Sequence, residues 1–301
     1  ITTLRRDVST DGRRATIAYT DDWREDAARR DFTINALSAD PRDGSIHDYF
    51  GGLDDLAAGI VRFIGDPMAR IAEDHLRILR FFRFQARFGT GEPDPAGLAA
   101  CAARANDLMA LSRERIADEL LKLLALPDPA PTVRLMIDHG IFRPVLPEID
   151  GAFDRLVALI AAEAAAGIPT AALRRLSALL PADPEVAQAV ASRLKLSNAA
   201  RKRLALATEP VGPAREMAYR IGRESAVDRL LLAGKVEAAQ ELVGWEIPKL
   251  PVSGGDLVSA GIVAGPAVAA MLRRIEDRWI AEGFPGETRA RAILAGIIRE
   301  S

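Results

Sequence analysis

The 301-residue sequence predicts an α+β protein that is predominantly α-helical. Ala, Leu and Arg are plentiful and aromatic residues make up only 5% of the chain, a composition that favours helices. Short runs typical of strands are confined to about the first 65 residues. From Asp66 onward, apolar residues recur at helical spacing, with Pro or Gly between the runs.

The first 65 residues are expected to alternate between short strands and short helices. The predicted elements are strands at 1–5, 15–19, 32–37 and 46–50, and helices at 22–30 and 54–58. Thr20 and Asp21 are candidate caps for the first helix. The run 32–37 is assigned to a strand from its β-branched alternation, although a helical turn is also compatible with it. Gly51 and Gly52 break the chain before the second helix.

One helix is predicted over the run that begins at Asp66 and continues to Phe88. Asp66 can cap it, and Pro67 suits the first turn, where a missing N–H costs nothing. At about 100° per residue, two faces separate. The apolar face holds Ile71, Ile78, Leu79, Phe82 and Ala86. The charged face, within an arc of about 120°, holds Arg70, Glu73, Asp74, Arg77 and Arg80.

Asp74 and Arg77 lie one turn apart on this charged face. A carboxylate accepts hydrogen bonds and a guanidinium donates a planar fork of them, so the pair is suited to reading the edge of a nucleobase. The alternative is a solvated face of spaced ion pairs, each worth about 0.2–0.5 kcal/mol.

The rest of the chain is predicted to be an irregular helical array without a fixed-period repeat. Helices are expected at 96–110, 112–126, 130–139, 153–166, 170–180, 184–194, 197–208, 213–221, 225–233, 236–244, 265–282 and 286–300. Ser112 and Ser197 are candidate caps. Trp245 and Trp279 are expected to pack in the C-terminal part and not against nucleotide.

The composition of the chain restricts the classes of function with which the sequence is compatible. With 40 basic and 42 acidic residues, the net charge of −2 gives no global nucleic-acid signature, so RNA binding requires a local basic surface. Lys195, Arg201, Lys202 and Arg203 form a cluster that could meet RNA phosphates, although basic helix faces are usually just solvated. The single cysteine excludes an internal disulfide. No apolar stretch of about 18 residues and no signal peptide is visible, so a cytoplasmic protein with no membrane partner is expected.

A second informative stretch covers residues 29–37. Arg30 and Asp31 at an element edge are suited to gripping a ribose, because the carboxylate accepts from hydroxyl groups and the guanidinium reaches phosphate or sugar oxygens. Asn35 can bond to hydroxyls or to backbone. The alternative is a local salt bridge with Asn35 as a structural amide.

These stretches resemble the ordered motifs of class II tRNA nucleotidyltransferases and bacterial poly(A) polymerases. The resemblance covers about residues 1–150, and the C-terminal half is similar only in being helical. The matching segments, in the family's order, are 29–37, 48–56, 65–80 and 112–120.

The resemblance implies a remnant of a polymerase-β-like head over residues 1–60, a helical neck with a base template over 61–127, and a helical body and tail that bind tRNA over 128–301. It also implies a hinge at 48–56 and a bracing role for 112–116. Its nucleotide site would comprise Arg30 and Asp31 at the ribose with Asn35 in support, Asp74 and Arg77 at the base of CTP or ATP, and Glu73 and Arg80 orienting them.

Phosphoryl transfer of this kind uses two magnesium ions held by carboxylates, which the family supplies chiefly from an Asp-x-Asp pair. That pair is not in this sequence, and we expect it upstream of Ile1. Asp7 matches a nearby family carboxylate and is a candidate third acidic residue. The expectation is that residues 1–301 alone do not catalyse.

The sequence therefore predicts an enzyme that adds CCA to the tRNA 3′ end from CTP and ATP with magnesium. A poly(A) polymerase or a partial enzyme that adds only CC or only A is the alternative within the class. A non-catalytic RNA-binding module is the alternative from another class.

Overall fold

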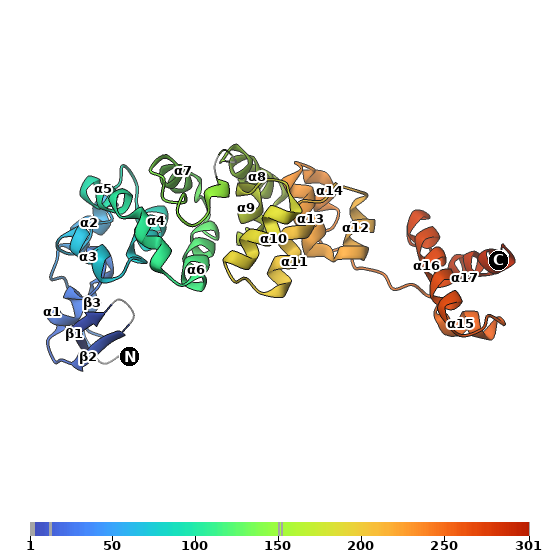
Figure 1. The fold of residues 1–301 in the computed structure, drawn as a ribbon, viewed down its shortest axis with the longest axis horizontal. Helices are drawn as coiled ribbons and strands as arrows, with labels where there is room; N and C mark the ends of the chain where they lie inside the picture. The colour runs from blue at the N-terminus through green and yellow to red at the C-terminus, as the bar shows by residue number, and fades with distance from the viewer. Residues whose placement is uncertain (1–3, 12–13, 150, 152, 301) are drawn as a thin grey trace. The chain divides into compact units, whose positions relative to one another are not determined.

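The computed structural model describes residues 4–11, 14–149, 151 and 153–300 (Figure 1). The chain divides into two compact units, one formed by Ile1–Pro210 with Asp228–Gln240 and the other by Val211–Val227 with Glu241–Ser301. Helices dominate both units, which confirms the predicted predominantly α-helical class. The predicted boundaries after residues 60 and 127 fall inside the first unit and stay predictions.

The first two strands form a hairpin that starts later than predicted. β1 (Arg5–Asp11) pairs antiparallel with β2 (Arg14–Tyr19), and the pairing begins with Arg5 opposite Tyr19. The strand predicted at 1–5 is therefore confirmed only at Arg5 and wrong at Leu4, which precedes the ladder, and its residues 1–3 lie outside the described part.

The first helix, α1 (Trp23–Ala28), is capped by a different residue from those expected. The Asp22 carboxylate accepts a hydrogen bond from the Arg24 N–H at 2.7 Å, so Asp22 is the cap. Thr20 instead donates its hydroxyl to Glu25 at 2.6 Å.

Residues 32–37 form a turn and not the predicted strand. The 3₁₀ helix η1 (Thr33–Asn35) follows Phe32, which makes a single β-bridge to Phe63. The Asn35 side-chain oxygen accepts from the Phe32 N–H at 3.3 Å, and this local bond closes the turn. β3 (Ser38–Ala39) and β4 (Ile46–His47) then form a small antiparallel pair.

Helix α2 (Gly52–Ala58) packs closely on this turn. Gly51 has φ of 76°, a conformation that favours glycine. A Cβ at Gly52 would lie 2.2 Å from the Thr33 carbonyl oxygen, so only glycine permits the approach. The Asp48 carboxylate accepts from the N–H groups of both Gly52 and Leu53 at 2.9 Å and caps the helix.

The single helix predicted over 66–88 is wrong, because the chain forms two helices there. α3 (Pro67–Glu73) is capped by Asp66 as expected, and α4 (Arg77–Phe88) follows after a break. At the break Asp74 is extended, with φ −152° and ψ 107°, and its Oδ1 accepts from the Leu76 N–H at 3.1 Å. This local bond competes with the helical pattern and restarts the helix.

The helices predicted for the rest of the chain are present to within a few residues, except that 96–110 divides into α5 and the 3₁₀ helix η2. The helix α15 and the 3₁₀ helix η3 were not predicted. In the first unit they are α5 (Pro95–Ala103), η2 (Ala105–Ala110), α6 (Arg113–Leu124), α7 (Ala130–Asp138), η3 (Pro147–Ile149), α8 (Phe153–Ala166), α9 (Ala172–Leu179), α10 (Pro184–Arg193), α11 (Asn198–Leu206) and α14 (Val236–Gln240). Further along are α12 (Ala214–Ile221), α13 (Arg223–Leu232), α15 (Gly254–Ser259), α16 (Pro266–Ala281) and α17 (Glu287–Arg299).

A buried ion network joins helices of the first unit. Glu163 accepts from Arg174 at 2.6 Å and from Arg175 at 2.9 Å, and all three residues are buried. Arg175 also donates to the Leu124 carbonyl at the end of α6, at 2.9 Å. The network therefore ties α8 and α9 to the C-terminal end of α6.

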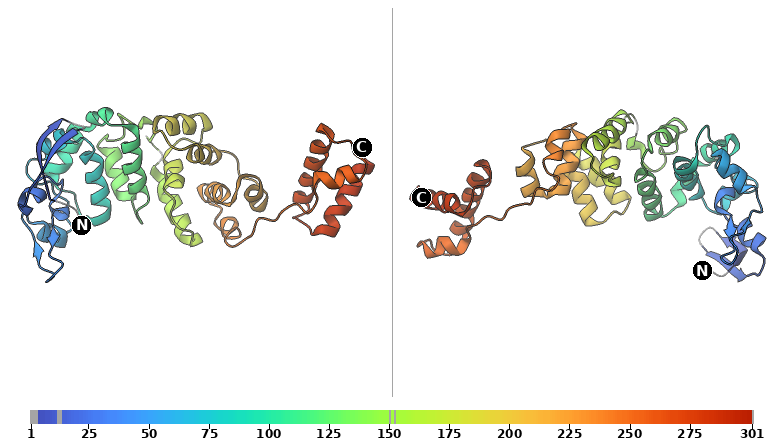
Figure 2. Two further views of the ribbon diagram at one scale, coloured as in Figure 1. Left: turned by 90° about the horizontal axis from the view of Figure 1, so that it is seen from below. Right: turned by 180° about the vertical axis from the view of Figure 1, so that it is seen from behind.

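In the second unit, α16 and α17 lie side by side (Figure 2). Trp279 on α16 is 1% exposed, and its indole N–H donates to the Pro285 carbonyl at 2.7 Å. Trp245 packs against Phe284, with ring centroids 5.5 Å apart. The packing role expected for both tryptophans is confirmed. None of the helices in the described part of the chain has the length and apolar character needed to cross a membrane.

Candidate nucleotide-binding site

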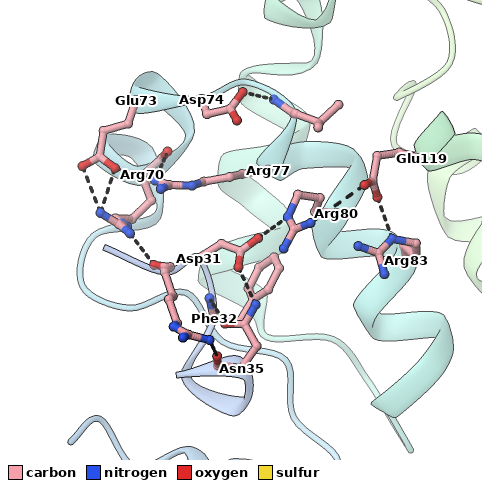
Figure 3. Close-up of polar contacts among 12 residues, drawn as sticks. Asp31, Phe32, Asn35, Arg70, Glu73, Asp74, Arg77, Arg80, Arg83 and Glu119 are labelled. Carbon is pink, nitrogen blue, oxygen red and sulfur yellow. Dashed lines mark hydrogen bonds and ion pairs between the residues drawn. The ribbon is translucent and has the colours of Figure 1, made fainter. Parts of the chain in front are cut away.

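An aromatic cluster brings the two informative stretches together. Phe32 is fully buried, and its ring centroid lies 4.9 Å from that of Phe84 on α4 and 5.0 Å from that of Phe63. Backbone bonds add to this packing, because the Ile64 N–H donates to the Asp31 carbonyl at 3.0 Å. Asp31, which precedes Phe32, is therefore held against α4 (Figure 3).

Asp31 is at the centre of the resulting polar cluster, between Arg80 and Asn35 (Figure 3). Its Oδ1 accepts from the Asn35 amide at 2.6 Å and its Oδ2 from the Arg80 Nε, while the residue is 5% exposed. Burial raises the pKa of the Asp31 carboxyl, but the hydrogen bonds and charge of Arg80 and Asn35 outweigh it and leave the pKa below its usual value. The supporting contact expected of Asn35 is present.

Arg30 contacts α3 through its backbone, because its carbonyl accepts from the Arg70 Nη2, while its side chain binds nearby groups. It donates to the Asn35 carbonyl at 2.9 Å and to the Asp26 carboxylate at 3.2 Å, and its side chain is 40% exposed. It also lines a cavity of about 330 Å³ with Trp23 and Pro41. Contact of the Arg30 side chain with sugar or phosphate oxygens stays a prediction.

The side chains of Asp74 and Arg77 do not bind each other, and the break between α3 and α4 is the reason. The Asp74 Oδ2 accepts from Arg115 on α6 at 2.6 Å, whereas Arg77 donates to Glu73. The single arc of charged residues that an unbroken helix would give is therefore wrong at Asp74. Both groups still lie on neighbouring turns of one short segment.

Arg77 is held by three acceptors. Its Nη1 donates to Glu73 and to the Arg70 carbonyl at 2.8 Å, and its Nη2 donates to the Arg29 carbonyl at 3.2 Å. Glu73 also accepts from Arg70 at 2.7 Å. Burial and the nearby positive charge of Arg77 lower the pKa of Arg70, while Glu73 opposes them. The orienting contact expected between Glu73 and Arg77 is present.

Arg80 orients Asp31 and does not bind Asp74. Burial lowers the pKa of Arg80, but the hydrogen bond and charge of Asp31 outweigh it and raise the pKa overall. Behind Arg80, Glu119 is 4% exposed and accepts from Arg83 at 2.6 Å. The sequence alone assigned the α6 motif a general bracing role, and it missed that Arg115 binds the Asp74 carboxylate.

The described residues form no metal site by themselves. No three His, Cys, Asp or Glu side chains come together as ligands in the ranges that the structure describes. Asp7 lies in β1 opposite Ile17, and its side chain falls outside what is described. The role expected for Asp7 therefore stays a prediction.

Comparisons with known proteins agree with these motifs. Residues 1–62 match the family model "Poly A polymerase head domain", and residues 92–153 match "Probable RNA and SrmB- binding site of polymerase A". The chain is 34% identical to the mitochondrial CCA tRNA nucleotidyltransferase 1 of Homo sapiens, an alignment that covers 95% of this chain and 70% of that protein. It is 40% identical to poly(A) polymerase I of Haemophilus influenzae, over 43% of this chain and 28% of that one.

A solved structure shares the fold. The CCA-adding enzyme of Bacillus stearothermophilus in complex with CTP superposes with a TM-score of 0.77 at 25% identity, over 99% of this chain and 78% of that one. The head-domain match and this superposition confirm the predicted fold class of a nucleotidyltransferase head followed by helical segments.

Proposed function

This chain belongs to the family of CCA tRNA nucleotidyltransferases and poly(A) polymerases, and on that premise we propose that it transfers CMP and AMP from CTP and ATP to the tRNA 3′ end. The observation that supports this proposal is the share of this chain over which each relative aligns. The CCA-adding relative aligns over 95% of the chain, helical C-terminal half included, while the poly(A) polymerase relative aligns over 43%. No nucleic-acid template is needed, since the protein itself would select the base.

Base selection falls to Asp74 and Arg77, and their hydrogen-bond inventory supports this role. A guanidinium has five N–H groups, and Arg77 commits two from Nη1 and one from Nη2. The Nε–H and one Nη2 N–H remain to donate to a base. Each Asp74 oxygen accepts one hydrogen bond, from Leu76 or from Arg115, and keeps a lone pair. The pair thus offers donors and acceptors without losing its present supports.

Asp31 would accept from the ribose hydroxyls. Asn35 and Arg80 each occupy one lone pair of its carboxylate, which leaves one on each oxygen. The lowered pKa of Asp31 keeps the group ionised and hence acceptor-only at neutral pH. Arg80 would position Asp31, and Glu73 would position Arg77.

Magnesium and a cytoplasmic location complete the proposal. Magnesium is expected from the chemistry of nucleotidyl transfer, although the described residues do not supply its ligands. The location is expected from the sequence alone, and the human relative is named as mitochondrial.

The test uses the full-length protein with magnesium and a tRNA that lacks its last three nucleotides. CTP and ATP are supplied singly and together, and product length is read at single-nucleotide resolution. Two additions from CTP, a third only with ATP and then a stop would support CCA addition. An ATP-only ladder would indicate a poly(A) polymerase, arrest after CC or addition of A alone a partial enzyme, and no extension a non-catalytic RNA-binding module.

A further inference from the structure

The direction of the Asp74 side chain depends on the break between α3 and α4. Asp74 lies outside a regular helix, so a helical backbone does not set the direction of its side chain. Here the Asp74 carbonyl accepts from the Arg77 N–H at 3.0 Å, and the Asp74 Oδ1 accepts from the Leu76 N–H at 3.1 Å. Whatever anchors the break therefore also aims the carboxylate proposed to read the base.

The side chains of two consecutive residues, His75 and Leu76, anchor the break. Leu76 is 9% exposed and belongs to the buried core. His75 points its Nδ1 at Asp107 on η2, with 3.6 Å between Nδ1 and Oδ2. The same Asp107 oxygen lies 2.5 Å from the Nε of Arg104. The residue next to Asp74 is thus tied to η2, which follows the helix α5 on which α3 packs.

The three facing atoms are shielded from solvent. Apart from these ion-pair contacts, the His75 Nδ1, the Asp107 Oδ2 and the Arg104 Nε have no hydrogen-bond partner among the described residues. Withdrawing such atoms from water costs free energy unless they satisfy one another. Loss of Asp107 would leave the His75 Nδ1 unpaired, whereas loss of His75 would leave Asp107 with Arg104 alone. In either case the break would be held by Leu76 alone.

We propose that His75 is a positioning residue for nucleotide selection, which aims the Asp74 carboxylate through its polar contact with Asp107. His75 does not touch the nucleotide in this role. The inference rests on the proposed function of Asp74. Its mechanism is geometric, because reacting and recognising groups displaced by about 1 Å lose on the order of a hundredfold in efficiency.

The test compares variants of the full-length protein for the Kd of CTP and ATP by calorimetry and for incorporation of CTP against UTP on the shortened tRNA. We expect His75→Ala and Asp107→Ala each to raise the Kd of CTP about tenfold, because a displaced Asp74 would lose about one hydrogen bond to the base, and to reduce CTP selectivity. The double variant should be no worse than either single one. His139→Ala, an exposed histidine at the end of α7, serves as the matched control.

Two conservative variants separate positioning from simple bracing. His75→Asn keeps an amide donor where Nδ1 lies, whereas His75→Gln moves it toward the place of Nε2. Recovery of Kd and selectivity by His75→Asn but not by His75→Gln supports the proposal, even if His75→Ala also lowers the unfolding temperature. Wild-type Kd and selectivity in His75→Ala, or equal behaviour of the Asn and Gln variants, would overturn it.

Failure of the proposed function would be detected in a different measurement from failure of the His75 proposal. It appears in the wild-type protein, as a product pattern other than two C additions and one A. The calorimetric Kd for CTP and ATP tests His75 whatever that pattern is.

Discussion

Asp74 accepts a hydrogen bond from Arg115 at 2.6 Å, although Arg77 is the arginine nearest to it in the sequence on the predicted face. The partner lies on α6, and the contact links the segments 65–80 and 112–120 through two residues that are 41 positions apart in the sequence. The carboxylate that would read the base is therefore held by a local bond from the Leu76 N–H and by a tertiary contact with Arg115.

Removing the Arg115 guanidinium should weaken nucleotide binding. Arg115→Met keeps much of the apolar stem but deletes the donor to Asp74, so we expect the KM for CTP to rise about tenfold. The same change in an Asp74→Ala background should add nothing, because the two residues act as one unit. Lys122→Met on the exposed side of α6 is the control. Additive effects would mean that Arg115 works elsewhere.

Asp74→Ala and Arg77→Ala should damage base selection more than folding. A good base-reading pair is worth about 1–3 kcal/mol, so discrimination of CTP and ATP against UTP and GTP should fall about 10- to 100-fold. Competition assays measure it, with Asp118→Ala as an exposed control. A less stable protein with unchanged nucleotide preference would favour the ion-pair interpretation.

Ile78→Asp should strongly destabilise the fold of the first unit. Ile78 is 0% exposed, so the substitution buries a carboxylate without a partner, and we expect a loss of at least about 3 kcal/mol in the free energy of unfolding. Arg87→Asp, on the exposed side of the same helix, should change it by less than about 1 kcal/mol. Urea denaturation compares the two, and similar midpoints would contradict the burial argument.

Asp31 should contribute to acid unfolding. Its pKa in the folded state is lowered below the usual aspartate value of about 3.9, so its stabilisation is fully present above that pH and is lost as pH falls through the folded value. In that window the unfolded state takes up the proton first. Asp31→Asn should be less stable at neutral pH and should show a shallower loss of stability below about pH 4. Unfolding free energies across that range test it, and parallel curves would contradict it.

Glu163→Ala should destabilise the first unit strongly. It leaves Arg174 and Arg175 buried without their shared carboxylate, and breaking such a buried pair costs about 3–5 kcal/mol. Glu237→Ala on α14 is an exposed control. Thermal unfolding of the two variants gives the comparison, and equal midpoints would show that the network adds no stability.

The sequence by itself determined the family, the predominance of helices and the residue types of the site. Asp31, Asn35, Glu73 and Arg77 were identified because carboxylate, amide and guanidinium groups stood in a family order with Gly and Pro between elements. The helix positions in the C-terminal half were predicted from the helical spacing of apolar residues, a pattern that can be read without tertiary information. Asn35 with Asp31 and Glu73 with Arg77 are also close in sequence, so their contacts needed little more than a turn.

Only the tertiary structure decided where the elements break and which distant groups meet. A helical period continues through Asp74, but a local bond to Leu76 and the Arg115 guanidinium on α6 make the extended break more favourable. The turn at 32–35 has a strand-like sequence, yet the Asn35 side chain closes it beneath the Phe cluster. The contact of His75 with Asp107 likewise depends on the packing of α3 against α5. Such choices rest on the balance of burial and hydrogen bonding across the whole unit, which no local pattern contains.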